Sequence, residues 1–402
     1  MRRFAVLLFS LSLLLCGCES DSSGSGGAEP APVDLTPTPL VLDDVAPGEL
    51  IAVEPGGETI CSRGTPFRFF VRGGSVNRVV VDFAGGGACW NELTCSVAGA
   101  IFNEEAPTLA DIKLSDDIPG FGGLYDLDNE ENPFKDHTIV HIPYCTGDIH
   151  WGDATVNYTD DVVIHHRGYE NVMSALTWIY ERFEDPEELF VTGCSAGAYG
   201  SIVHSANLAN EYPNARLRVL ADSGAGIITD TFLADSFPKW NAQSRLPDWI
   251  EGLQGDVTQL GIEDVYEAIA TEYPDQRFSQ FTTAFDDDQV FYFDVMGGDP
   301  EDWSPRMFSS LENIEERTTN FRSYVAPGPM HCIIPYTHMY TRTSDGVRFV
   351  DWLTSFLRDP TIPDSVACSG DDCLIDSVCD GCAEGNGHIY CGFCDGWESS
   401  SE

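Results

Sequence analysis

The stretch from Glu188 to Gly200 constrains this chain more than any other part of it. An apolar, β-prone run breaks into Gly193-Cys194-Ser195-Ala196-Gly197, and a small-residue helix start follows. A strand, a sharp turn and a helix in this order form a nucleophile elbow, which lifts the serine hydroxyl above a sheet. Small neighbours are needed because a strained turn has no room for side chains. We therefore predict that Ser195 is a nucleophile; the alternative is a chance match in a glycine-rich loop.

The composition is that of a folded and very acidic protein. The 402 residues are 43% hydrophobic and 21% charged, which suits one α/β domain of ordinary size plus extra segments. The 65 acidic residues against 21 basic ones give a formal net charge of -44. Such a surface repels nucleic acid and anionic membranes, so neither is an expected partner. A solvated surface suited to salty surroundings explains the charge better than an acidic binding patch.

The N-terminus has the pattern of an export signal over residues 1–18. Met1-Arg2-Arg3 is positive, and the apolar run from Phe4 to Leu15 is too short to span a membrane. It ends in Leu15-Cys16-Gly17-Cys18, which resembles the bacterial lipobox and predicts lipidation of Cys18; plain cleavage is the alternative. Residues 19–45 are rich in Ser, Gly and Pro, as in a flexible tether. We expect an exported protein that is secreted or anchored by lipid to the cell envelope, with no other membrane contact.

Predicted strands and helices alternate between Thr65 and Asp359, which indicates a parallel sheet covered on both faces. The predicted strands are 78–83, 138–143, 188–192, 217–221 and 278–285, and the predicted helices are 161–183, 198–211 and 345–358. We therefore predict an α/β-hydrolase-like fold with a mostly parallel sheet over residues 46–360, followed by a small cysteine-rich tail over residues 361–402. The aromatic-rich segment 230–272 interrupts the alternation, either as a cap over the site or as ordinary packing.

The cysteines indicate disulfide bonds. Removing Cys16 and Cys18 from the 14 cysteines leaves 12, an even number in a chain expected to be exported. Six lie in the main domain and six in the tail, and their spacing does not give the pairing. The tail contains Cys379-x-x-Cys382 and Cys391-x-x-Cys394, which would suit a zinc site in the cytosol. Outside the cytoplasm a small disulfide knot is the favoured interpretation, with zinc as the alternative.

A serine nucleophile needs a histidine to accept its proton and a carboxylate to orient that histidine. In α/β-hydrolases the three follow one another as Ser, acid and His. His204 lies in the predicted helix behind the elbow and His388 lies in the tail, which leaves His331 or His338. His331 is favoured because it lies in a Pro/Gly loop after an apolar, strand-like run.

The carboxylate is expected where the predicted strand 278–285 ends. Asp286, Asp287 and Asp288 follow that strand, and composition alone does not choose among them. Asp286 comes first, and carboxylates at the C-terminal ends of strands face the site in open α/β sheets.

Acyl transfer also needs N–H donors for the oxyanion, typically from the residue after the nucleophile and from a glycine-rich loop after an early strand. Such a loop follows the predicted strand 78–83. Gly86, Gly87 and Ala196 are the predicted donors. A phosphate-binding loop is the alternative, but no lysine follows the glycines.

Six ordered motifs between about Gly64 and Asp359 resemble the pectin acetylesterase and Notum carboxylesterase family. They are residues 83–89, 142–148, 192–197, 220–224, 285–289 and 330–332. The family's acid motif reads Phe or Tyr, Asp, two variable residues and Gln, which implies that Asp286 is the catalytic aspartate. The family's histidine precedes a cysteine, which implies His331. The resemblance also implies serine carboxylesterase activity on O-acyl groups, with no cofactor and no metal.

The chain departs from the family at two places. Family members tend to carry tryptophan beside the oxyanion glycines and after Ala-Asp-Ser-Gly, where this chain has Gly87 or Ala88 and Ala225. The acidic surface would also slow an encounter with polyanionic pectin. Acetylated neutral glycans or small acyl esters are therefore equally expected substrates.

Together these features predict a secreted serine carboxylesterase that hydrolyses O-acyl esters, foremost O-acetyl esters, through Ser195, His331 and Asp286 and an acyl-enzyme. The competing class is a non-catalytic surface protein that binds a glycan or a partner on a hydrolase scaffold. An amidase or peptidase is a further alternative, because the same triad serves both bonds.

Overall fold

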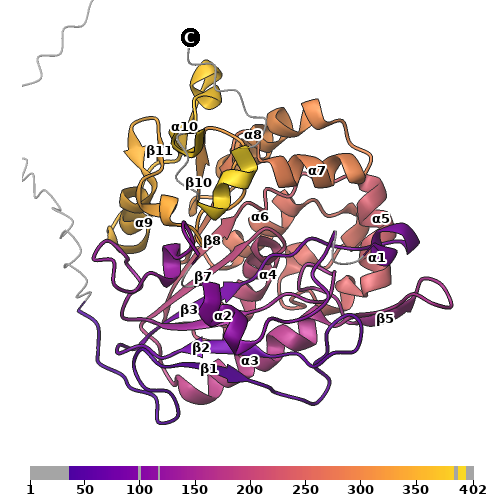
Figure 1. Cartoon of the computed structure of the whole chain (residues 1–402), viewed down its shortest axis with the longest axis horizontal. Helices are drawn as coiled ribbons and strands as arrows, with labels where there is room; N and C mark the ends of the chain where they lie inside the picture. Colours follow the sequence, from indigo (N-terminus) through magenta and orange to yellow (C-terminus); the bar gives the residue numbers. More distant parts are fainter. Residues whose placement is uncertain (1–35, 98–100, 116–117, 384–387, 395–402) are drawn as a thin grey trace, which may run out of the picture. The chain divides into compact units, whose positions relative to one another are not determined.

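The computed structural model describes residues 36–97, 101–115, 118–383 and 388–394 (Figure 1). The predicted signal, the lipidation site Cys18 and most of the tether lie outside these residues and stay predictions. Leu42 and Val45, at the end of the predicted tether, are buried in the main core. Within the described ranges, no helix has the length and apolar character needed to cross a membrane.

A nine-stranded sheet organises the described part of the chain, in the order β1-β2-β4-β3-β7-β8-β9-β10-β13. Strands β1 and β2 are antiparallel to their neighbours, and every pairing from β4 onwards is parallel. The strands are β1 (Leu50–Val53), β2 (Phe69–Arg72), β3 (Arg78–Phe83), β4 (Thr138–Ile142), β7 (Glu188–Cys194), β8 (Arg216–Asp222), β9 (Arg277–Thr283), β10 (Phe321–Ala326) and β13 (Val366–Ala367). The predicted α/β-hydrolase-like fold is confirmed.

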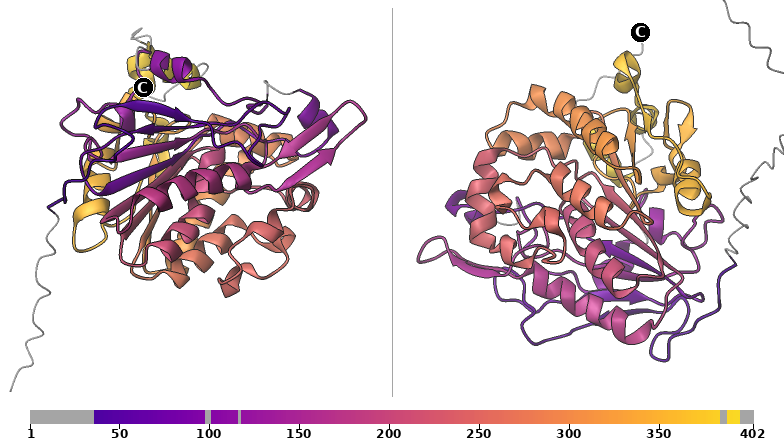
Figure 2. Two further views of the ribbon diagram at one scale, coloured as in Figure 1. Left: turned by 90° about the horizontal axis from the view of Figure 1, so that it is seen from below. Right: turned by 180° about the vertical axis from the view of Figure 1, so that it is seen from behind.

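Helices cover both faces of this sheet (Figure 2). The helices are α1 (Glu92–Ser96), α2 (Leu109–Ser115), α3 (Gly168–Arg182), α4 (Ala196–Glu211), α5 (Asp230–Trp240), α6 (Ile262–Glu272), α7 (Asp287–Val295), α8 (Pro300–Arg317), α9 (Phe349–Arg358) and α10 (Ser377–Ala383). Short 3-10 helices are η1 (Gly123–Tyr125), η2 (Ala242–Arg245), η3 (Glu251–Leu253), η4 (Val257–Gln259), η5 (Thr337–Tyr340), η6 (Gly370–Leu374) and η7 (Ile389–Cys394).

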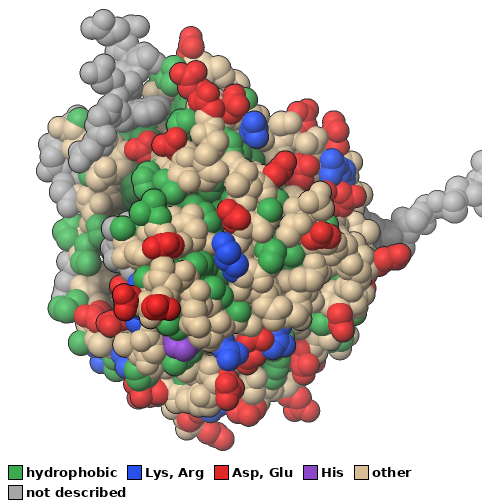
Figure 3. Space-filling model, turned by 90° about the vertical axis from the view of Figure 1, so that its right-hand side faces the viewer, with side chains coloured by type: hydrophobic (Ala, Val, Ile, Leu, Met, Phe, Trp, Pro, Cys, Tyr) green, Lys and Arg blue, Asp and Glu red, His purple; other side chains and the backbone are tan. Residues whose placement is uncertain are grey.

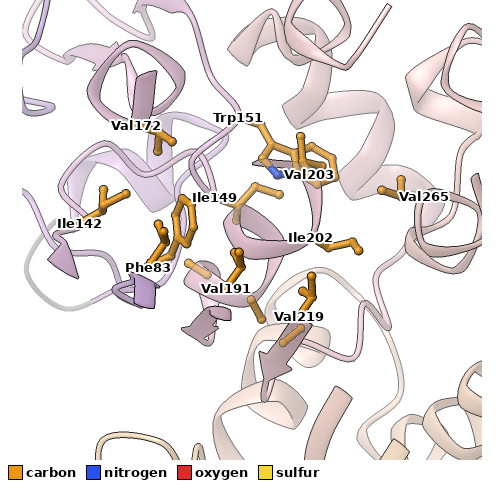
Figure 4. Close-up of a cluster of buried hydrophobic side chains, with 14 of the residues drawn as sticks. Phe83, Ile142, Ile149, Trp151, Val172, Val191, Ile202, Val203, Val219 and Val265 are labelled. Carbon is orange, nitrogen blue, oxygen red and sulfur yellow. The ribbon is translucent and has the colours of Figure 1, made fainter. Parts of the chain in front are cut away.

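Two hydrophobic cores form because successive residues of a strand point to opposite faces of the sheet. Val79 and Val81 of β3 enter the larger core, which includes side chains of α3 and α4, whereas Val80 enters the second core beneath α9. Figure 4 shows part of the larger core, with Val191 and Val219 of the sheet near Ile202 of α4. Burial on both faces explains the continuous apolar runs Val79–Val81 in β3 and Leu189–Val191 in β7.

Two predicted helices begin later than expected, because β-hairpins occupy their first residues. The prediction of a helix from residue 161 was wrong at its start, since β6 (Val163–His166) pairs with β5 (Ala154–Asn157) and α3 begins at Gly168. The helix predicted from Asp345 begins at Phe349, after the hairpin of β11 (Thr343–Ser344) and β12 (Val347–Arg348). Asp345 and Gly346 both have positive φ, of 46° and 73°, as tight two-residue hairpin turns require.

The twelve cysteines form six disulfide bonds, as predicted. Within the main domain the pairs are Cys61–Cys145, Cys89–Cys95 and Cys194–Cys332. Within the tail they are Cys368–Cys373, Cys379–Cys394 and Cys382–Cys391. The two Cys-x-x-Cys motifs are thus paired with each other, and their sulfurs are not the thiolates that a zinc site requires.

Acidic side chains are scattered over the surface. Figure 3 shows one face, on which Asp and Glu side chains are spread among a smaller number of Lys and Arg side chains. The charge of -44 therefore does not gather into one patch on this face.

Candidate active site

Ser195 lies on a strained turn between β7 and α4. Its φ and ψ are 56° and -120°, a conformation that is unusual for a residue other than glycine and typical of a nucleophile elbow. The turn depends on small neighbours. A Cβ added at Gly197 would lie 1.9 Å from the carbonyl oxygen of Phe83, and one added at Gly193 would lie 2.4 Å from the carbonyl oxygen of Gly197. Ser195 is partly exposed, which leaves its hydroxyl within reach of a substrate.

His331 and Asp286 form a buried hydrogen-bonded pair. The distance from His331 Nδ1 to Asp286 Oδ1 is 2.7 Å, and the two residues are 6% and 0% exposed. His331 lies on the loop after β10, and Asp286 caps the N-terminus of α7, where its Oδ1 also accepts the backbone N–H of Gln289. His331 and Ser195 line the same cavity, so the structure brings the three predicted residues to one site.

Gln289 fixes the carboxylate of Asp286. Its side-chain Nε2 donates to Asp286 Oδ2 at 2.9 Å and to Thr282 Oγ1 at 3.0 Å, while its Oε1 accepts the N–H of Ala225 at 2.8 Å. The amide therefore ties the end of β9 to the segment after β8. This contact gives a physical reason for the glutamine in the motif Asp-x-x-Gln.

Asp222 and Ser223 hold the loop that carries His331. The fully buried Asp222 carboxylate accepts the N–H groups of Ile333 and Ile334 at 2.9 and 2.8 Å. Ser223 Oγ accepts the N–H of Cys332 at 2.8 Å. Burial raises the pKa of Asp222 to about 7, although the two N–H donors oppose that rise. Sequence reasoning noted Ala-Asp-Ser-Gly as a motif but gave these two residues no role.

Acidic groups surround the imidazole of His331. Besides Asp286 at Nδ1, Asp288 Oδ2 lies 3.7 Å from Nε2, and the Asp288 side chain is 47% exposed. Burial by itself lowers the pKa of His331, but the carboxylates of Asp286, Asp288 and Asp222 outweigh it and raise the pKa well above its usual range. The carboxylates therefore favour the protonated form of the imidazole.

This arrangement predicts a shifted pH profile in the variant Asp288→Asn. If His331 is the general base, kcat/KM rises with pH as its imidazole loses a proton. Removing the Asp288 charge should lower the pKa of His331, so the acid limb of the profile should move to lower pH. Because Asp288 is half exposed, we expect a shift of about half a unit to one unit of pH, and a smaller one at high salt.

The measurement is kcat/KM for a chromogenic ester between acidic and alkaline pH. Asp287→Asn is the matched control, because it removes an equal charge one residue away on an exposed side chain. An acid limb that stays in place in Asp288→Asn, or moves to higher pH, would contradict the prediction.

Two of the three predicted oxyanion donors border the cavity. Gly87 and Ala196 belong to its lining, whereas Gly86 is not among the lining residues. Gly86 and Gly87 have φ values of 151° and 73°, which only glycine adopts readily. A Cβ at Gly87 would lie 2.1 Å from the hydroxyl oxygen of Tyr292. The glycines therefore let the loop pass close to the site.

The cavity beside Ser195 has apolar walls. Its empty volume is about 610 Å³, part of which is open to solvent. The apolar lining comes from several segments: Ile149, Ile227, Ile228, Phe232 of α5, Ile262 of α6, Met296 after α7, and Trp303 of α8. Segment 230–272 thus contributes Phe232 and Ile262 to the cavity, while its Phe237, Trp240 and Tyr266 are buried in the core.

The histidine and cysteine clusters near the site are not suited to metal binding. Cys194, His331 and Cys332 lie close together, as do Cys89, Cys95 and His166. The cysteines of both groups are joined in disulfide bonds, and a metal ligand must be a thiolate.

Comparison with known proteins adds an independent observation. Residues 47–238 match the family model described as Pectinacetylesterase. A curated relative, Pectin acetylesterase 11 of Arabidopsis thaliana, is 26% identical over 156 residues. These matches support assignment to the pectin acetylesterase family. The second match spans 38% of this chain and 38% of the relative.

The pectin acetylesterase match contains the glycine loop and the elbow with Ser195, but it ends before Asp286 and His331. The assignment of those two residues to the candidate site therefore depends on the geometry described above and on the motifs around them. The matched region carries part of the candidate site, and what the likeness implies about activity belongs to the proposal below.

Proposed function

We propose that the protein is a serine carboxylesterase that hydrolyses O-acyl esters, foremost acetyl esters of a glycan. The observation that carries the proposal is the convergence of Ser195, on its strained elbow, and the His331–Asp286 pair on one apolar cavity. The pectin acetylesterase family assignment supports the same class of reaction. The alternative of a non-catalytic binding protein gives no reason for this convergence.

In the proposed reaction, Ser195 Oγ attacks the ester carbonyl carbon while His331 Nε2 takes its proton. The N–H groups of Gly87 and Ala196 stabilise the oxyanion. His331 then gives the proton to the leaving alcohol as the ester C–O bond breaks, and an acyl-enzyme remains. Water, activated by the same imidazole, releases the acid and restores Ser195. Asp286 keeps Nδ1–H in place and stabilises the imidazolium.

The walls of the cavity and the charge around it restrict the substrate. The apolar side chains favour an uncharged acyl group, because they offer no hydrogen bond or opposite charge to a buried charged group. Asp288 beside His331 and the overall charge of -44 oppose a polyanionic chain. Acetylated neutral glycans and small acyl esters therefore fit this site better than acetylated pectin with free carboxylates.

We further propose that the protein is exported and is held at the bacterial cell envelope by lipid at Cys18. Six disulfide bonds fit an oxidising compartment. Mass analysis of the mature N-terminus tests the anchor, since lipidation leaves an acylated Cys18 as the first residue.

The proposed activity can be tested with a fluorophosphonate probe and a panel of esters. We expect the probe to label Ser195, as located by peptide mapping, and acetate to be released from acetylated neutral xylan faster than from acetylated polygalacturonate. Para-nitrophenyl esters of increasing acyl length would measure how much of the cavity the acyl group uses. Absence of labelling together with absence of turnover on every ester would favour the non-catalytic alternative.

A further inference from the structure

The cysteine-rich tail packs against the loop that carries His331. Figure 1 shows this tail in yellow beside β10. The N–H of Gly328, in the loop after β10, donates to the carbonyl oxygen of Cys373 at 3.0 Å. Gly328 also lies so close to Asp376 that an added Cβ would be 1.8 Å from its Oδ2. The tail is therefore fitted to the backbone of this loop.

A buried ion pair strengthens that contact. Arg342 Nη2 and Asp376 Oδ2 are 2.9 Å apart, and their side chains are 1% and 2% exposed. The same guanidinium donates to the carbonyl oxygen of Pro327, and its Nη1 lies 3.2 Å from Met330 Sδ. Because breaking a buried pair leaves an uncompensated charge, the pair fixes the tail against the residues just before His331.

The 3-10 helix η7 of the tail reaches the imidazole itself. The ring centroids of Phe393 and His331 are 6.1 Å apart, with an angle of 60° between the planes. Phe393 also contacts Tyr336, and Tyr390 of the same 3-10 helix packs on His338 at 4.7 Å. Phe393 therefore belongs to the side chains that surround His331.

Disulfide bonds hold this short segment in place. Cys394, next to Phe393, is bonded to Cys379, and Cys391 is bonded to Cys382, so both bonds join η7 to α10. Met330, Cys379 and Tyr390 form a small buried cluster of their own. A segment with so small a core depends on such cross-links for its stability.

We propose that the tail is a positioning element for His331, in which Phe393 keeps the imidazole in its reactive orientation. The inference rests on the proposed function, in which His331 transfers the protons. Asp286 holds Nδ1, but a single hydrogen bond leaves the ring free to tilt. Phe393 packs against the ring and limits its tilt. Catalytic groups need such support, because a displacement of about 1 Å can cost about 100-fold in rate.

The test compares Phe393→Ala with Phe393→Tyr, which restores the ring. In Phe393→Ala we expect kcat for ester hydrolysis to fall by about 10- to 100-fold with KM within about twofold of wild type. The rate constant for inactivation by a saturating fluorophosphonate should fall by a similar factor, and Phe393→Tyr should recover most of both losses. Ile389→Ala is the matched control, since this side chain lies in the same 3-10 helix and is 46% exposed.

A second variant removes the disulfide bond beside Phe393 and leaves Phe393 itself unchanged. Cys379→Ser/Cys394→Ser releases residue 394, next to Phe393, from its bond to residue 379. Like Phe393→Ala, this variant should have a lower kcat than wild type. The proposal is overturned if Phe393→Ala keeps kcat within about twofold of wild type, or if Phe393→Tyr fails to recover it while the thermal midpoint is unchanged. Failure of the proposed function gives a different result, because wild-type protein would then not be labelled at Ser195.

Discussion

Replacing Ser195 by alanine should lower the turnover number for ester hydrolysis by about 10⁴-fold or more, and His331→Ala should lower it by a similar factor. Without Oγ no acyl-enzyme can form, and without the imidazole the hydroxyl keeps its proton at neutral pH. The double variant should be no slower than either single one, because the residues act as a unit. The N–H donors of Gly87 and Ala196 would support the residual rate.

Asp286→Asn tests the role of the Asp286 carboxylate alone. The side chain keeps its shape and its place beside Gln289, but it can no longer stabilise the imidazolium or favour a proton on Nδ1. We expect kcat to fall by about 10⁴-fold. The measurements are burst and steady-state kinetics with para-nitrophenyl acetate, with the thermal midpoint as a test of folding.

His165→Ala is the control for these variants. His165 lies on the β5–β6 hairpin, where Nδ1 is 3.0 Å from Thr155 Oγ1, and it should keep wild-type turnover. Turnover by Ser195→Ala at the wild-type rate would show that the nucleophile is another residue. Loss in Ser195→Ala but not in His331→Ala would show that the base is another residue.

Local sequence was enough to predict the elbow and most of the sheet. The run of apolar residues before Gly193 is continuous because β7 is buried on both faces, and the glycines on either side of Ser195 are required by contacts within the turn. The place of Asp286 directly after a predicted strand, and of His331 in a Pro/Gly loop after a strand-like run, favoured these two residues, and their catalytic roles stay predictions. These features share one property, since each depends on residues that are close together in the sequence.

Contacts between distant segments could not be predicted in the same way. Asp222 accepts N–H groups from residues more than 100 positions away, and nothing in the motif around it reveals those partners. The hairpin of β5 and β6 was missed because Val163 fits a helical spacing as well as a strand. The place of Phe393 beside His331 depends on how the described part of the tail packs against the domain. Six cysteines in each set allow fifteen pairings, so the sequence could not give the bond between Cys194 and Cys332.

The disulfide bond between Cys194 and Cys332 is expected to contribute strongly to stability. Cys194 precedes Ser195 and Cys332 follows His331, so the bond joins the two segments that carry these residues. Their sequence separation is 138 residues, and neither Cys61–Cys145 nor Cys89–Cys95 closes the same loop. In the chain-entropy model, such a loop corresponds to about 5 kcal/mol of stability, and native disulfides typically contribute about 2–5 kcal/mol. We therefore expect Cys194→Ser/Cys332→Ser to lose most of the protein's free energy of unfolding, because that free energy is small in ordinary domains.

The control is Cys89→Ser/Cys95→Ser, whose bond closes a separation of only 6 residues and should cost about 2 kcal/mol in the same model. Urea unfolding without reductant measures both variants. The activity of the folded Cys194→Ser/Cys332→Ser protein should fall much less than its stability, because Asp222 and Ser223 still bind the loop through three backbone N–H groups. An equal loss of stability in the two variants would contradict the loop-length argument. A complete loss of activity in the folded protein would instead show that the bond itself sets the geometry of Ser195 and His331.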